Sequence, residues 1–322
     1  MTKQENGLAK LAVIGGQIAV GVALLALWEG VVRMGLADPF IFGQPTQVFR
    51  YLALEALPGK QLWIDTGYTM AGTAMAFAFG SLLGIGCGLL FVEFRTLGDI
   101  ARPYVTLLNS LPRVALAPLF VVWFGLGLTS KVVLGMSLVF FILLLNTIAG
   151  ALSVDQNLVK LCQSLGAGRW TIFRKVILPS SAPSIFAGLK LGLVYALLGV
   201  VVGEMIGAIN GLGMRVVLYS NLFEMNKVFG LLIFLALITT ALTQAMHRLE
   251  KYFLRWQDLT ALSAEKILQA GRVQNVYALI RIIDKTIAPE LLDRRRHPLA
   301  RRTDELGQLI VRQRLLDPDV VP

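Results

Sequence analysis

The chain has 322 residues, of which 56% are hydrophobic and 16% are charged, with a formal net charge of +10. Soluble domains carry about 25% charged residues, so the composition argues against an ordinary soluble protein. The positive charge is better explained by the basic cytoplasmic loops of a membrane protein than by nucleic-acid binding. Cys87 and Cys162 form neither a disulfide framework nor a zinc-binding spacing.

The apolar residues fall in blocks of roughly 20, the length that a helix needs to cross a bilayer core. Continuous apolar runs predict helices, because the strands of a membrane barrel alternate in polarity. The first run is longer than the apolar core of a signal peptide and has no obvious cleavage site, so we expect a retained helix. The sequence predicts six spans, at 11–32, 67–92, 104–125, 131–152, 183–207 and 228–249.

Lysine and arginine set the expected orientation of these spans. If the N-terminus is cytoplasmic, the cytoplasmic segments hold most of the basic residues outside the tail, including Arg169, Arg174 and Lys175. Basic residues concentrate on the cytoplasmic side of membrane proteins. Both termini are therefore predicted to be cytoplasmic.

A stripe of small residues runs along the second span. Gly72, Gly80, Gly84 and Gly88 recur at multiples of four, and Ala76 fills the gap. Residues four apart share one helix face, and small residues let another membrane helix approach closely. The stripe predicts a tight helix–helix seam, although a generally glycine-rich membrane helix would give the same pattern.

The third span contains Pro112, Arg113 and Pro118 within an otherwise apolar stretch. Each proline removes a backbone donor and can kink a helix. Broken backbone at membrane depth is tolerated where it lines a cavity. One interpretation puts Arg113 beside a solute pathway, and the other has it extend from the cytoplasmic end of the span to the headgroups.

Polar residues in other spans are further pathway candidates. Glu204 is an intramembrane carboxylate, which is a functional candidate by default, although a hydrogen bond across a subunit interface explains it equally well. For Asn146 a bridge between helices is favoured over solute contact. The candidate pathway residues are Asn109, Pro112, Arg113, Pro118, Asn146 and Glu204.

The loop after the fourth span is amphipathic and mildly basic. Leu158, Leu161, Cys162 and Leu165 fall on one face of a short helix predicted over 156–165, and Gly166 is a natural stop. Trp170, Ile172 and Phe173 add a second apolar patch. A linker has no need of bulky apolar residues, whereas a docking element uses them as anchors in a partner's cleft.

This loop resembles the cytoplasmic EAA loop of binding-protein-dependent ABC transporter permeases. Gly166, Val176, Leu178 and Pro179 stand at matching positions, but Lys160-Leu161-Cys162 replaces Glu-Ala-Ala. Flanking matches such as Leu111-Pro112-Arg113 and Gly203-Glu204-Met205 resemble the nitrate, sulfonate and taurine branch. The resemblance covers about residues 20 to 257.

The resemblance implies an all-α, polytopic type I permease in the bacterial inner membrane. Two copies would form the pathway, a cytoplasmic ABC ATPase dimer would dock near 155–168, and a periplasmic or lipid-anchored binding protein would deliver a small anion, organic acid or sulfonate. The chain would be no enzyme and would bind no cofactor, since ATP and Mg belong to the ATPase and the chain lacks a P-loop motif. The implied coupling residues are Leu158, Leu161, Cys162, Leu165, Gly166, Ala167, Trp170, Phe173, Leu178 and Pro179.

The expected organisation is a first helix and periplasmic loop at 1–66, a core permease domain at 67–257, and a cytoplasmic helical extension at 258–322. The extension either contacts and regulates the ATPases, or lies on the membrane surface, where arginine clusters attract anionic lipid, or is partly disordered. Two other function classes stay open. An ion-driven secondary transporter would usually need more spans and internal repeats, and a membrane-embedded enzyme would need a set of catalytic side chains that these spans do not offer.

Overall fold

The computed structural model describes residues 3–254, and the side chains of residues 13–254. All regular elements in this part of the chain are helical. The extension expected at 258–322 lies outside the described residues.

Five helices of the described chain are long and apolar enough to cross a membrane, and a bent pair brings the number to six. The five helices lie close to the predicted spans, but α4 begins seven residues earlier than expected, at Lys60. They are α1 (Lys3–Arg33), α4 (Lys60–Glu93), α7 (Leu128–Leu152), α10 (Leu178–Ile206) and α12 (Met225–Phe253).

The bent pair replaces the single span expected over 104–125. It consists of α5 (Arg95–Ser110) and a second arm that starts with the 3₁₀ turn η2 (Arg113–Leu116) and continues as α6 (Ala117–Phe124). The two arms meet at 78°. Leu111 is extended because the ring of Pro112 disfavours helical geometry in the residue before it. Pro118 lies in the first turn of α6, where a missing N–H costs nothing.

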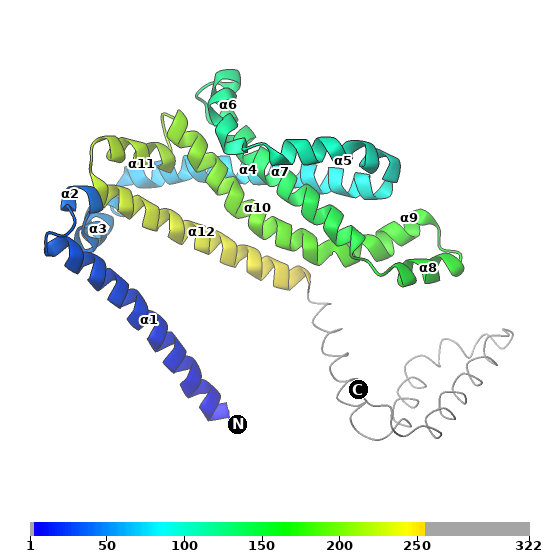
Figure 1. The fold of residues 1–322 in the computed structure, drawn as a ribbon, viewed down its shortest axis with the longest axis horizontal. Helices are drawn as coiled ribbons and strands as arrows, with labels where there is room; N and C mark the ends of the chain where they lie inside the picture. Colours follow the sequence, from blue (N-terminus) through cyan, green and yellow to red (C-terminus); the bar gives the residue numbers. More distant parts are fainter. Residues whose placement is uncertain (1–2, 255–322) are drawn as a thin grey trace. The chain divides into compact units, whose positions relative to one another are not determined.

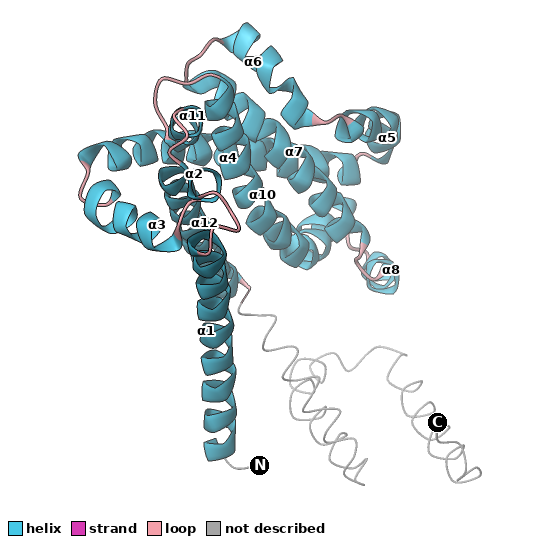
Figure 2. Ribbon diagram, turned by 60° about the vertical axis from the view of Figure 1, so that its left-hand side comes forward, coloured by secondary structure: helices cyan, strands magenta, loops and turns pink. Residues whose placement is uncertain are grey.

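Helices α4, α7 and α10 pack together as the centre of the described chain (Figure 2). Ala76, Val139, Leu143, Ala196 and Val200 are buried between them. A second buried cluster, which includes Tyr51, Leu212, Leu231 and Phe234, joins α3 (Pro45–Tyr51), α11 (Leu212–Asn221) and α12. One apolar cluster thus holds α4, α7 and α10 together, and a separate one joins α3, α11 and α12.

The glycine stripe of α4 lies against α7 and α10. A Cβ atom on Gly84 would lie 2.6 Å from the carbonyl oxygen of Phe140, and one on Gly88 would lie 2.8 Å from Cβ of Thr147. Gly80 faces Val139 in the same way, and Gly72 faces Val200 of α10. A side chain at these positions would therefore push the helices apart.

Short elements connect the spans at the two ends of the bundle. Figure 1 shows α8 (Gln156–Ser164) and α9 (Arg169–Ile172) at one end, and α11 with α2 (Pro39–Phe42) and α3 at the other. Single π-helical turns, η1 (Leu52–Ala56) and η3 (Phe173–Ile177), follow α3 and α9. The loop expected between the first two spans is therefore mostly helical.

Candidate functional site

A pocket of ≈ 570 Å³, which we call the upper pocket, lies where the bent pair meets α7 and α10. It brings together four of the six candidate pathway residues, namely Asn109, Pro112, Arg113 and Asn146. Its other walls are mainly apolar, with Leu138, Ile142 and Leu191 among them, and include Tyr195. Pro118 and Glu204 do not line it.

The guanidinium of Arg113 dominates the chemistry of the upper pocket. Nη2 donates to the backbone oxygen of Asn109 at 2.9 Å and also to the Asn109 side-chain oxygen. The guanidinium lies over the ring of Phe141, 4.3 Å from its centroid, a favourable cation–π position. Its Nε is buried and has no hydrogen-bond partner in the described chain.

Asn146 is oriented by its own helix. Its amide nitrogen donates to the carbonyl oxygen of Ile142 at 2.8 Å, and its Cβ packs against the backbone of Gly188 in α10. This hydrogen bond holds the Asn146 side chain against its own helix at the wall of the pocket. No hydrogen bond from Asn146 to another helix is present in the described chain.

Glu204 lies in a different place, buried between α10, α4 and the start of α11. Only 3% of its surface is exposed. The hydroxyl of Thr69 lies 2.9 and 3.0 Å from its two carboxylate oxygens, and the backbone N–H of Gly213 donates to it at 2.9 Å. Glu204 thus accepts from one of the first backbone donors of α11, and the N–H of Leu212 donates to the Thr69 hydroxyl; α11 has no side-chain cap at its own N-cap residue.

Asp65 completes this buried cluster from the neighbouring turn of α4. It accepts a hydrogen bond from the backbone N–H of Gly211 at 3.0 Å and forms an ion pair with Nε of Arg215. Burial by itself lowers the pKa of the Arg215 guanidinium, but the hydrogen bond and charge of Asp65 outweigh it and raise that pKa. Gly211 has φ +116°, and a Cβ there would collide with the Glu204 carboxylate.

The loop between α7 and α10 presents an apolar surface at one end of the bundle. Asp155 caps α8 by accepting from the N–H of Asn157 at 2.8 Å, and Gly166 ends the helix with φ +82°. No residue of α8 is buried. Leu161 is 57% exposed and Leu165 78%.

Trp170 is exposed beside this helix and stacks on the buried Phe173 at 5.5 Å. The implied coupling residues are therefore divided: Phe173 anchors the loop, and Leu178 and Pro179 begin α10. Leu158, Leu161, Leu165 and Trp170 stay available to a partner. We call these four residues the coupling face.

Comparisons with known proteins place this architecture in a family. The family described as "Binding-protein-dependent transport system inner membrane component" matches residues 80–257. The chain belongs to that family. The riboflavin transport system permease protein RibX of Chloroflexus aurantiacus is 32% identical over 234 residues, which cover 73% of this chain and 87% of RibX. The taurine transport system permease protein TauC of Escherichia coli is 31% identical over 245 residues, with 75% and 88% covered.

A solved structure supports the fold of this permease. The MetNI methionine ABC transporter, in an inward-facing conformation, has a chain that matches with a TM-score of 0.53 and 21% identity. The match covers 60% of this permease and 97% of that chain. The resemblance found in the sequence is thus confirmed at the level of family and fold, and the permease is a multi-pass membrane transport component rather than an enzyme.

The sequence alone did not identify the residues that pair with the charged side chains buried in the bundle. Asp65, Thr69 and Arg215 were not singled out, although Glu204 was. Lys190 of α10 pairs with Glu250 of α12 at 2.7 Å. A charged residue within a span is a visible signal, but its partner lies 60 residues away here and 150 residues away for Asp65 and Arg215.

Proposed function

We propose that this permease is the membrane-spanning subunit of an ATP-driven importer for a small anionic solute, such as a sulfonate, delivered by an extracytoplasmic binding protein. The observation that supports an anionic solute is the position of Arg113, which lines the upper pocket among mainly apolar side chains. Arginine offers five donors in a planar fork that suits oxyanions. Relatives named for taurine and aliphatic sulfonates support the same class.

The ATPase partner is proposed to dock on the coupling face. Four bulky apolar side chains on an exposed loop match the anchors that fill a partner's cleft. ATP and Mg would be held by an ATPase dimer and not by this chain. Closure of that dimer would move α8, and η3 and α10 would carry the movement toward the upper pocket, because they continue directly from this loop.

The number of permease copies and their orientation in the membrane are part of the same proposal. Two copies of the permease would enclose the pathway, with lipid around them and α8 on the cytoplasmic side. Both chain termini would then be cytoplasmic. Reporter fusions at each terminus test this orientation, since a periplasmic signal at either end would contradict it.

The decisive test reconstitutes the permease with its ATPase and binding protein in proteoliposomes and uses taurine and ethanesulfonate as probes. We expect uptake of at least one probe to require ATP and to stop when the ATPase is omitted. Uptake that persists on a proton or sodium gradient without ATP would overturn the proposal in favour of a secondary transporter. ATP-dependent uptake of a neutral solute alone would overturn the anionic class.

A further inference from the structure

Helix α5 carries two opposite stripes. Along one face, polar residues recur at spacings of four and three, and beyond the break the series continues at Arg113. Residues at this spacing share one helix face. The opposite face is apolar and exposed, with Leu97, Ile100, Tyr104 and Leu107. We call the first set the polar stripe: Arg95, Asp99, Arg102, Thr106, Asn109 and Arg113.

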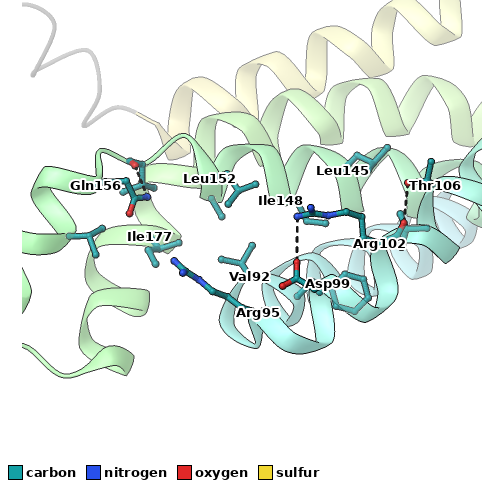
Figure 3. Close-up of a pocket in the computed structure, with 16 residues that line it drawn as sticks. Val92, Arg95, Asp99, Arg102, Thr106, Leu145, Ile148, Leu152, Gln156 and Ile177 are labelled. Carbon is teal, nitrogen blue, oxygen red and sulfur yellow. Dashed lines mark hydrogen bonds and ion pairs between the residues drawn. The ribbon is translucent and has the colours of Figure 1, made fainter.

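A second pocket, of ≈ 380 Å³, lies beside the polar stripe at the end of the bundle that carries α8. Figure 3 shows Arg95, Asp99, Arg102 and Thr106 along its α5 side, with Leu145 and Ile148 near Thr106 and Arg102 and with Ile177 near Arg95. We call it the lower pocket. Leu145 lines both this pocket and the upper one, so the two pockets are neighbours along α5 and α7.

The charge of the polar stripe favours anions. It holds three arginines and a single aspartate, and Asp99 is engaged by Arg102 at 3.6 Å. Arg95 has no hydrogen-bond or ion-pair partner among the described residues. A cleft whose charges are mainly of one sign raises the local concentration of the opposite ion. An anion that leaves Arg113 would thus meet further positive charge along the same helix.

The polarity of the two stripes also indicates which face of α5 meets water. Charged side chains in a membrane helix are costly in lipid and almost always face a water-filled cavity or the protein interior. The apolar stripe can meet lipid or a neighbouring chain without that cost. We therefore expect the face of α5 that carries the polar stripe and borders the lower pocket to meet water.

We propose that the lower pocket is a second anion-binding station, and that the polar stripe is the wall along which a solute bearing a sulfonate or carboxylate moves between the two pockets. This inference rests on the proposed importer function and adds Arg95, Arg102 and Thr106 to the solute path. Arg95 and Arg102 would attract the anionic group, while the apolar α7 wall would receive the rest of the solute.

Cysteine labelling tests the station without knowledge of the natural solute. Cys87 and Cys162 are the chain's two cysteines and are replaced by serine, and Thr106→Cys is introduced into the full chain assembled with its ATPase in membranes. The probes are 2-sulfonatoethyl and 2-(trimethylammonium)ethyl methanethiosulfonate. After correction for their rates with a free thiol, we expect the anionic reagent to react about 10-fold faster or more.

Adding Arg95→Gln and Arg102→Gln should remove most of this preference. Tyr104→Cys on the apolar stripe is the matched control, which should react slowly with both reagents. Val105→Cys, which also lines the lower pocket, replaces Thr106→Cys if the latter does not assemble, and the same preference is expected.

Equal rates for the two reagents would overturn the station, as would a thiol protected from both, which would indicate lipid in the pocket. ATP-driven uptake by the unaltered permease is measured separately. If uptake is intact and the anion preference is missing, only the second station is wrong. If uptake does not depend on ATP while the preference is present, the importer function is wrong instead.

Discussion

The carboxylate of Asp65 pairs with Arg215 through one oxygen and accepts from the backbone N–H of Gly211 with the other. A single side chain of α4 therefore holds both the first residue before α11 and a side chain within that helix. Thr69, one turn further along α4, reaches Glu204 and the N–H of Leu212. Negative charge at a helix N-terminus is favourable. Two carboxylates thus hold α11 against the bundle.

Asp65→Asn should destabilise the permease strongly. The substitution leaves the guanidinium of Arg215, whose side chain is only 17% exposed, without its counter-charge. Breaking a buried ion pair by removal of one partner costs about 3–5 kcal/mol. The melting temperature of the purified permease in detergent should therefore fall by several degrees.

The ion pair of Arg33 and Glu29, in which the arginine lies at the surface, provides the control for this substitution. The Arg33 side chain is 64% exposed, and surface ion pairs contribute about 0–1 kcal/mol. Arg33→Ala should leave the melting temperature almost unchanged. Asp65→Asn combined with Arg215→Met should recover part of the loss, and an Asp65→Asn variant as stable as Arg33→Ala would contradict the role of the pair.

Two glycines of α4 should respond to alanine in opposite ways. At Gly84 the new Cβ would lie 2.6 Å from a backbone oxygen of α7, whereas at Gly86 it would meet nothing within 4 Å. Overpacking costs about 1–3 kcal/mol, and alanine is favoured over glycine in a helix by up to about 1 kcal/mol. Thermal melting in detergent should show Gly84→Ala destabilised and Gly86→Ala equal to the parent or better. Equal effects at both positions would show that α4 and α7 are not in close contact.

Hydropathy and spacing predicted much of the fold because they record local requirements. The long spans follow from apolar runs, and the seam of α4 follows from glycines four residues apart. Pro112 and Pro118 indicated a kink, but the sequence predicted one span over 104–125 and not two arms. The bend of 78° was not predictable, because the direction taken after a proline depends on what the second arm packs against.

The buried cluster of Asp65, Glu204 and Arg215 marks the limit of sequence reasoning. A carboxylate in a span is recognisable from sequence, but its position relative to other helices is set by tertiary packing. The sequence therefore grouped Glu204 with Arg113, whereas the structure places them in separate environments. Of the polar stripe of α5, only Asn109 and Arg113 were candidates from the sequence, because only the adjoining pockets show which face of this helix is enclosed.

Leu161 should be an energetic anchor for the ATPase. Its side chain is 57% exposed on a helix without buried residues, so its loss should not disturb the permease itself. Truncation of an interface anchor commonly costs more than 1 kcal/mol, and about 1.4 kcal/mol is a tenfold change in affinity. Leu161→Ala should weaken ATPase binding about tenfold in a titration with purified components.

Gln163→Ala is the matched control for the coupling face, since Gln163 lies on the same helix but away from Leu161 and Leu165. It should bind the ATPase like the parent, and both variants should keep the parental melting temperature. Parental ATPase affinity of Leu161→Ala would rule out the coupling face as the docking site.

Arg113→Gln should lower the specificity constant for uptake of an anionic probe. Taurine serves as the probe once uptake by the unaltered permease is established, and hydrogen bonds to charged groups contribute about 1.5–3 kcal/mol. Loss of the guanidinium beside Asn109 therefore predicts a fall of kcat/KM by about 10-fold to 100-fold. Arg113→Lys should recover part of the activity, because it keeps the charge but not the planar fork.

Arg50→Gln, on the exposed surface of α3 away from the pocket, should change nothing. Parental uptake by Arg113→Gln would remove Arg113 from the solute path, and a loss equal to that caused by Arg50→Gln would assign the effect to surface charge.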